Sequence, residues 1–132
     1  MDYKDLISKA YAAREMAYVP YSNFKVGAAL ITEDNTIYTG CNIENASYGA
    51  TNCAERTAIF KAVSEGHNKI KAIAIVGAKG NYTFPCGICR QVILEFANEN
   101  VDIILAKNEN EYIVKTIDEI LPGGFTIKDL KK

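Results

Sequence analysis

The sequence predicts an α/β fold of three layers, with a mixed five-stranded sheet between helices. Two apolar runs, at residues 70–76 and 101–106, are nearly continuous, as in strands buried on both faces. Stretches with helical periodicity alternate with these runs, which implies right-handed crossovers and a parallel section of sheet. An alternating pattern over residues 24–32, a polar turn and a second strand over 36–41 predict an antiparallel hairpin in the same sheet.

The first predicted helix covers residues 6–17, where apolar residues recur at helical spacing. Asp2 is in position to cap this helix. Pro20 limits it, because the residue before a proline avoids the helical region. A short loop then leads into the strand over 24–32. Gly27 and the alanines of that strand indicate that another element packs very close to the sheet.

A polar loop over residues 42–52 separates the hairpin from the second helix. Loops of this length inside a compact domain tend to be functional. The second helix is predicted over residues 53–65, with Thr51 or Asn52 as its N-cap and Gly66 at its C-terminal end.

A third helix, over residues 86–98, connects the two buried strands. A short fifth strand is predicted at 111–115 and a helical turn at 117–121. The run at 122–124, Pro-Gly-Gly, breaks that turn, and Phe125 follows it in a tail that the pattern predicts to be exposed.

Length and composition are those of one compact domain over residues 1–132. Hydrophobic residues make up 48% of the chain and charged residues 23%, and the net charge is -1 with no run of like charges. Tight binding to nucleic acid needs a basic face, which this composition does not provide. No apolar run approaches a membrane span, and the charged start lacks a signal-type apolar core, so a cytoplasmic protein without a membrane partner is expected.

Three cysteines and one carboxylate occur in two short stretches at predicted helix starts. Cys86 and Cys89 lie three residues apart, which places their sulfurs on one side of a first helical turn. Cys53 begins the other helix and completes three corners of a tetrahedron. Zinc prefers this geometry, and a catalytic zinc keeps its fourth position for water or substrate. Glu55 is two residues from Cys53, so it is placed to handle protons beside the open position rather than to bind the ion.

Three thiolates around Zn²⁺ leave a formal charge of about −1, which opposes ionisation of a bound water. Helix N-termini offset part of this charge, because their dipoles favour anions. Arg56 is predicted to donate a hydrogen bond to a ligand sulfur and so to compensate further. For Arg90 a helix-surface position explains the residue equally well.

Two other interpretations of the cysteines remain open at this point. A closed structural zinc site needs a fourth ligand, for which the sequence offers Cys41 and His67. A dithiol redox pair at Cys86 and Cys89 is the second, since such pairs also open helices. The redox interpretation leaves the Cys-Ala-Glu sequence at residues 53–55 unexplained.

The chain resembles the cytidine deaminases over nearly its full length. The resemblance rests on residues 24–30 (FKVGAAL), 40–49 (GCNIENASYG), 53–56 (CAER), 85–92 (PCGICRQV) and 121–125 (LPGGF). It implies that the three cysteines hold one zinc ion per chain and that Glu55 shuttles protons. The reaction implied is hydrolytic deamination of cytidine and 2'-deoxycytidine, releasing ammonia, in pyrimidine salvage.

The resemblance also implies where the nucleoside is held, with contacts from Phe24, Asn42, Glu44, Tyr48, Ala54 and Phe125. Asn42 and Glu44 point the same way in an extended segment, and an amide beside a carboxylate matches a ribose hydroxyl. A related blasticidin-type deaminase shares the zinc motifs, but this Asn-x-Glu pair favours the nucleoside enzyme. The three-cysteine branch is homotetrameric, which implies that Phe125 reaches a neighbouring subunit's pocket and stacks on the pyrimidine.

Overall fold

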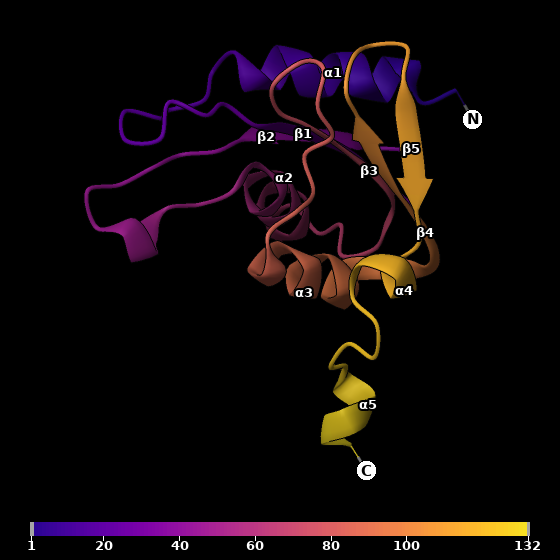
Figure 1. Cartoon of the computed structure of the whole chain (residues 1–132). Helices are drawn as coiled ribbons and strands as arrows, with labels where there is room; N and C mark the ends of the chain where they lie inside the picture. The colour runs from indigo at the N-terminus through magenta and orange to yellow at the C-terminus, as the bar shows by residue number, and fades with distance from the viewer. Residues whose placement is uncertain (1, 132) are drawn as a thin grey trace.

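The computed structural model describes residues 2–131 and shows one mixed sheet with the strand order β2-β1-β3-β4-β5 (Figure 1). The strands are β1 (Gly27–Thr32), β2 (Ile37–Cys41), β3 (Ile70–Val76), β4 (Ala97–Ala106) and β5 (Tyr112–Lys115). The pair β3 and β4 is parallel, and the other three neighbouring pairs are antiparallel. Both the predicted hairpin and the predicted parallel section are therefore confirmed.

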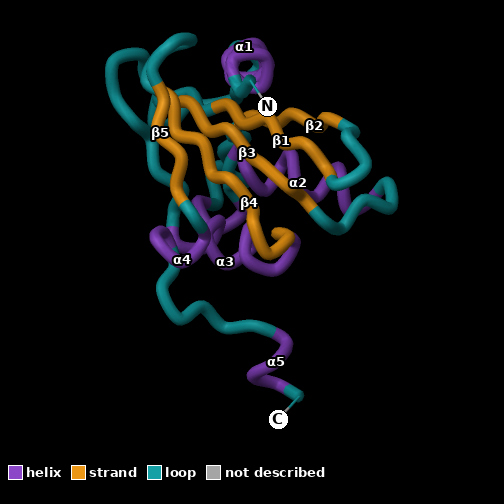
Figure 2. The backbone as a smooth tube through the Cα atoms, turned by 90° about the vertical axis from the view of Figure 1, so that its right-hand side faces the viewer, coloured by secondary structure: helices purple, strands orange, loops and turns teal. Residues whose placement is uncertain are grey.

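Helices cover both faces of this sheet, which confirms the three predicted layers (Figures 1 and 2). Helix α1 (Lys4–Arg14) lies on one face, and α2 (Ala54–Ser64), α3 (Gly87–Phe96) and the short α4 (Ile117–Ile120) lie on the other. Strand β1 shows why both faces are apolar, because Ala28 and Leu30 join the core under α2 and α3 while Ala29 and Ile31 join the core under α1. None of the helices within residues 2–131 has the length and apolar character needed to cross a bilayer.

Glycines let two helices approach the sheet very closely. A methyl group at Gly27 would collide with the carbonyl oxygen of Ala10 and lie 2.8 Å from the backbone nitrogen of Arg14, both in or at the end of α1. At Gly40 it would lie 2.6 Å from the nitrogen of Ala58 and 2.7 Å from the oxygen of Ala54, both in α2. The close approach predicted at Gly27 is thus present, and Gly40 provides a second one under the helix that begins at Cys53.

Several predicted boundaries are wrong for identifiable reasons. The first strand begins at Gly27 rather than residue 24, because the Asn42 side chain accepts from Val26 N at 2.9 Å and donates to Phe24 O at 2.8 Å. Helix α1 ends at Arg14, and the next residues form tighter turns in which Ala17 N donates to Arg14 O. Helix α3 ends at Phe96 because β4 begins directly after it.

The N-cap of α2 is Cys53, not the predicted Thr51 or Asn52. The backbone of Asn52 is instead paired with Ile43 in an isolated bridge, which anchors the loop between β2 and α2. Gly66 follows the last turn of α2 with a φ of 94°, as expected for a glycine that ends a helix.

Two short elements were not predicted. A 3₁₀ turn, η1 (Tyr48–Ala50), lies in the loop that projects from the body, and α5 (Ile127–Leu130) forms in the tail beyond α4 (Figure 1). Thr126 caps α5 in a capping box with Asp129. Phe125 is 56% exposed, which confirms the predicted exposure of this tail.

Candidate metal and catalytic site

The sheet brings the starts of α2 and α3 to one edge. Gly27 of β1 lies opposite Cys41 on one side and Val76 on the other, so β2 and β3 end at the same level. The chain leaves both strands at this edge and continues into α2 and α3 respectively. Ligand sites of α/β sheets are usually built at such an edge from the strand-to-helix connections.

Three thiols meet there. The Sγ atoms of Cys53, Cys86 and Cys89 all lie within 4.8 Å of one another, and those of Cys53 and Cys86 are 3.6 Å apart. Tetrahedral zinc with Zn–S bonds of about 2.3 Å requires S···S distances of roughly 3.8 Å. The donor set therefore fits one zinc ion with three protein ligands and leaves one position for another group.

Hydrogen bonds to sulfur stabilise negative charge in this cluster. Cys86 is the N-cap of α3, and its Sγ accepts from Cys89 N at 3.4 Å. Arg56 Nη2 lies 3.3 Å from Cys53 Sγ, so the predicted arginine-to-sulfur contact is present. The hydrogen bond with Cys89 and then that with Arg56 lower the pKa of Cys53 to about 5. These contacts favour a thiolate, the form of cysteine that binds a metal.

Arg90 is not directed at the sulfurs. Its Nε donates to Pro85 O and its Nη1 to Ile120 O, both at 2.8 Å. These contacts connect the segment before the cysteine pair to the end of α4. The structure thus favours a role for Arg90 in holding backbone segments together.

Glu55 lies in the first turn of α2 and is only 3% exposed. Burial, which disfavours the charged carboxylate, raises its pKa to about 7. A carboxyl group that titrates near neutral pH can both accept and release a proton. Its pKa also responds to the charge of Cys53 and to a hydrogen bond with Cys89, so the carboxyl group lies beside the thiols.

Neither alternative fourth ligand reaches the thiols. Within residues 2–131, the group of candidate metal ligands contains the three cysteines and neither Cys41 nor His67. His67 Nδ1 instead lies 3.1 Å from an oxygen of Asp34. A closed structural site made with either residue is therefore not present.

A redox dithiol is also a poor match to this geometry. All four cysteines are free thiols. Cys89 is buried, and Cys86 has Cys53 as a neighbour in addition to Cys89. A two-cysteine mechanism gives no role to Cys53 or to the buried Glu55.

The predicted ribose residues organise a loop. Glu44 accepts hydrogen bonds from Tyr21 N and Ser22 N, each at 3.0 Å, and from the Ser22 hydroxyl. The Ser22 hydroxyl oxygen also accepts from Phe24 N at 3.0 Å, and Asn42 bridges Phe24 and Val26 as described above. Hydrogen bonding lowers the pKa of Glu44, with the Ser22 hydroxyl as the largest cause, so the carboxylate is charged at neutral pH.

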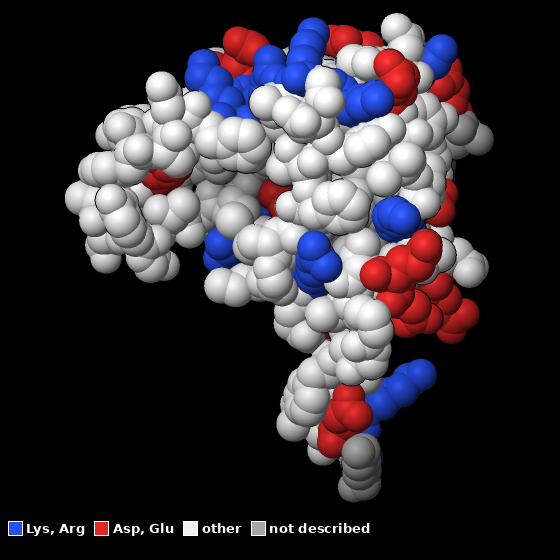
Figure 3. Space-filling model, viewed as in Figure 1, with Lys and Arg blue, Asp and Glu red and all other residues white. Residues whose placement is uncertain are grey.

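A cavity of about 350 Å³ adjoins this loop and is lined by Tyr21, Ser22, Glu44, Tyr48 and Thr51. The structure thus brings Glu44 and Tyr48 together, with the Tyr48 ring edge-on to Tyr21 at 5.8 Å. Space-filling Figure 3 shows the molecule hollowed between the projecting loop and the body. Sequence reasoning missed Ser22, although its position in the polar Tyr-Ser-Asn stretch between Pro20 and the first strand was the available signal.

The other predicted substrate residues are distributed differently. Ala54 is fully buried at the start of α2, and the Phe24 ring is exposed beside Gly77. Phe125 is not part of the cavity at Glu44, and it lines a separate one with residues from the end of α3 and from α5. Within one chain, therefore, Phe125 and the residues near Glu44 are not brought together.

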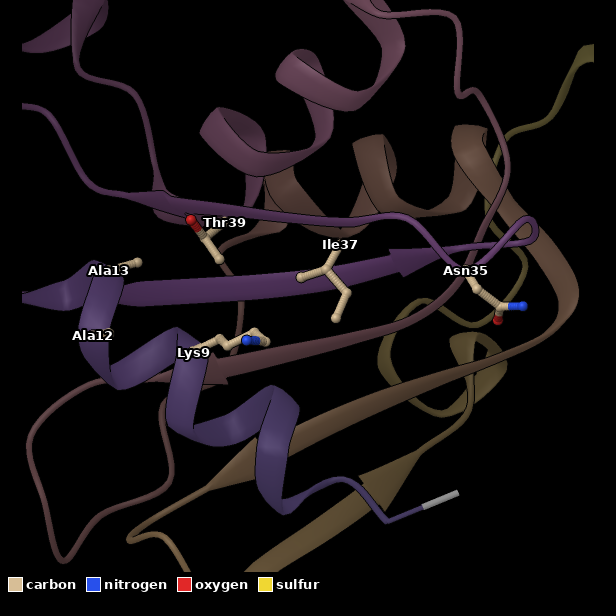
Figure 4. Close-up of a pocket in the computed structure, with 6 residues that line it drawn as sticks. All are labelled: Lys9, Ala12, Ala13, Asn35, Ile37 and Thr39. Atoms are coloured by element: carbon tan, nitrogen blue, oxygen red, sulfur yellow. The ribbon is translucent and has the colours of Figure 1, made fainter.

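A larger cavity lies away from this chemistry, between α1 and the edge strand β2 (Figure 4). It measures about 660 Å³ and is lined by Lys9, Ala12, Ala13, Asn35, Ile37 and Thr39. Lys9 is the one titratable side chain in that lining, so the cavity has no acid–base pair or metal ligands. Its size alone does not make it an active site.

Comparison with known sequences agrees with this site. Residues 1–105 match the family described as the cytidine and deoxycytidylate deaminase zinc-binding region. The chain is 52% identical to the cytidine deaminase of Sporosarcina psychrophila over 130 residues, which cover 98% of this chain and 96% of that protein. It is 50% identical to the cytidine deaminase of Halalkalibacterium halodurans over 130 residues, with 98% of each chain covered.

Solved structures of cytidine deaminases share the fold of this chain. The crystal structure of cytidine deaminase from Burkholderia pseudomallei matches with a TM-score of 0.88 and 47% identity, over 95% of this chain and 100% of that chain. The cytidine deaminase structure from Mycobacterium tuberculosis matches with a TM-score of 0.84 and 38% identity, over 95% and 98% of the two chains.

Proposed function

Because the chain belongs to the cytidine and deoxycytidylate deaminases, we propose that it catalyses the hydrolytic deamination of cytidine and 2'-deoxycytidine in pyrimidine salvage. The products are uridine or 2'-deoxyuridine and ammonia. The observation that carries the proposal is the buried Glu55 at the head of α2, next to three thiols with zinc-site spacing.

Cys53, Cys86 and Cys89 hold one zinc ion per chain. Zinc in such a site supplies a Lewis acid that lowers the pKa of water and makes it a nucleophile at neutral pH. Arg56, through its hydrogen bond to Cys53, offsets part of the charge of the three thiolates.

Glu55 moves the protons of the reaction. Its carboxylate removes a proton from the attacking water, whose oxygen forms a bond to C4 of the pyrimidine. The carboxyl group then delivers that proton to ring N3. A second proton, taken from the new hydroxyl group by the carboxylate, goes to the amino group, and the C4–N bond breaks to release ammonia. A group with a pKa near 7 performs both directions of transfer efficiently.

The nucleoside sugar is held by Asn42 and Glu44, and Glu44 lines a cavity that also includes Tyr48. Phe24 lines the approach to the base, and Ala54 contributes backbone groups at the start of α2. A charged Glu44 carboxylate accepts strongly from a ribose hydroxyl, which supports a nucleoside over a free base. A blasticidin-type substrate is the alternative, and the Asn42-x-Glu44 pair and the cytidine deaminase relatives favour cytidine.

The active unit in this proposal is a homotetramer in which Phe125 of one chain completes the pocket of another. The exposed ring on a tail that projects from the body supports this arrangement (Figure 1). A cytoplasmic location is consistent with it, because three free thiols must stay reduced to bind metal.

Two measurements on the purified protein test the proposed function. Metal analysis should find one zinc per chain, and incubation with cytidine should release ammonia with the ultraviolet change of conversion to uridine. Blasticidin S is the comparison substrate. Zinc without deamination of either compound indicates a structural metal module, and deamination by metal-free protein contradicts the mechanism.

A further inference from the structure

Helix α3 holds the C-terminal segment at three places. Arg90 Nη1 donates to Ile120 O at 2.8 Å, and Gln91 Nε2 donates to Phe125 O at 2.7 Å. Between these two bonds the tail packs so tightly that a methyl group at Gly124 would collide with Cδ2 of Leu94. Three residues from two successive turns of one helix thus secure both ends of the segment from Ile120 to Phe125.

We propose that Gln91 is a positioning residue for Phe125. Its amide fixes the backbone from which the Phe125 ring projects, and so sets the direction in which the ring meets a nucleoside. This inference rests on the proposed function, in which that ring contacts the base. Gln91 itself does not touch the substrate in this proposal.

The local chain explains why such an anchor is needed. Gly123 has a φ of 65° and is followed by a second glycine, so the backbone entering Phe125 has little conformational restriction of its own. Phe125 is 56% exposed, and its hydrogen bond to Gln91 involves the backbone carbonyl, which leaves the ring free to project. Beyond Phe125, the Thr126 capping box fixes only the start of α5.

Gln91 also connects the tail to the metal position. It lies two residues after Cys89 in α3, the helix that begins at Cys86. A rigid helix that presents two thiols at its start and binds the tail in the same stretch keeps Phe125 in a defined relation to those thiols. If the Phe125 ring serves a neighbouring chain, α3 therefore places its two thiols in the pocket of its own chain and the ring in the pocket of the neighbour.

The first test is a tryptophan reporter, because the sequence contains no tryptophan. Phe125→Trp places a single fluorophore at the end of the tail. In this background Gln91→Met removes the donor and keeps a good helix former of similar length. We expect lower anisotropy of the tryptophan emission after Gln91→Met, partial recovery with Gln91→Lys, which restores a donor, and no change with Lys61→Met on the exposed side of α2.

The second test is kinetic and uses chains that keep Phe125. Gln91→Met should raise KM for cytidine about three- to tenfold, the range expected from one neutral hydrogen bond. The value of kcat and the zinc content should stay within twofold of the parent. Gln91→Lys should bring KM part of the way back to the parent value. Loss of kcat together with zinc would show that Gln91 supports the metal helix instead, which overturns the proposal.

The two tests separate the inference from the proposed function. Unchanged anisotropy in the Gln91→Met reporter contradicts the proposed role of Gln91 in holding the tail, whether or not the protein deaminates cytidine. If the parent does not deaminate cytidine, the proposed function fails, while the anisotropy still decides whether Gln91 holds the tail.

Discussion

At the scale of single residues, the site contains two carboxyl groups whose environments shift their pKa values in opposite directions. Glu55 is buried, which raises its pKa, whereas Glu44 is half-buried and its pKa is lowered by hydrogen bonds, first from the Ser22 hydroxyl. One carboxyl group is thereby suited to exchange protons and the other to stay charged. Their environments, rather than their chemistry, assign them different tasks.

Glu55→Gln should abolish deamination while leaving zinc bound. The amide has nearly the same shape, but it cannot take a proton from water. Proton transfer by one placed side chain contributes about 10²–10⁴-fold, and Glu55 acts more than once in the proposed mechanism, so the loss should be at least that large. Turnover and zinc content are measured on the same sample. Near-normal turnover in the zinc-loaded variant would remove Glu55 from the mechanism.

Arg56→Ala should weaken zinc binding and slow turnover, because Cys53 loses its charged hydrogen-bond donor. Changes to groups that contact metal ligands cost about 10–100-fold in affinity or activity. Competition with a chelator measures the affinity. Arg90→Ala is the comparison, since its hydrogen bonds go to carbonyl oxygens and not to sulfur. If the two variants lose the same zinc affinity, the Arg56 contact has no special role.

Glu44→Gln should raise KM for cytidine and leave zinc in place. Loss of a charge-assisted hydrogen bond to ribose should cost roughly 1.5–3 kcal/mol. Ser22→Ala is the matched control, because it removes a loop contact of Glu44 but leaves the carboxylate available. A Ser22→Ala effect as large as that of Glu44→Gln would mean that Glu44 acts only by holding the loop at Tyr21 and Ser22.

At the scale of elements, the position of α2 depends on the absence of a side chain at Gly40. The backbone of α2 lies within 2.7 Å of the position that a methyl group would occupy there. Since Cys53 and Glu55 are at the start of α2, any outward movement of this helix also moves one thiol of the metal cluster and the proposed proton-transfer group.

Gly40→Ala should therefore destabilise the fold by about 1–3 kcal/mol, as overpacking does in well-packed cores, and should also weaken zinc binding. Denaturant unfolding and metal analysis provide the two measurements. Gly49→Ala is the control, because a methyl group at Gly49 meets no atom within 4 Å and should change stability by less than about 0.5 kcal/mol. Equal stability of the two variants would contradict the close packing of α2 on β2.

At the scale of the whole molecule, a single chain leaves its tail outside the body. Helix α5 extends away from the layers, and Ile127 and Leu130 are exposed together with Phe125 (Figures 1 and 2). A chain that exposes large apolar side chains on a projecting segment gains by covering them with another surface. This is the physical basis for expecting the tail to act in a neighbouring subunit.

Mixing two inactive chains tests this arrangement. Glu55→Gln chains keep the tail, and chains that end at Gly124 keep Glu55. Exchange of subunits should recover activity, because some pockets then combine an intact Glu55 with a Phe125 from the other chain. Each protein incubated alone is the control. No recovery in mixed oligomers, or a fully active parent that is monomeric by light scattering, would show that Phe125 does not act in trans.

Local sequence patterns determined much of this molecule. The strand at residues 70–76 has the predicted bounds, because a continuous apolar run between polar segments has one favourable conformation. The zinc ligands could also be chosen in advance, since the spacing of Cys86 and Cys89 and the pairing of Cys53 with Glu55 are properties of short segments. The start of the first strand could not be predicted, because the Asn42 side chain, sixteen residues from Val26, takes the place of a strand partner.

Only the tertiary structure decided which segments meet. The matching ends of β2 and β3 bring Cys53 to Cys86 and Cys89, and this register is set by packing across the whole sheet. The bond from Gln91 to Phe125 joins residues 34 positions apart, and the tight contact at Gly40 depends on where α2 crosses the sheet. The sequence by itself therefore determined the main helices and strands and the choice of metal ligands, whose causes are local. The burial of Glu55, the loop held by Glu44 and the anchored tail come from long-range contacts that no short segment encodes.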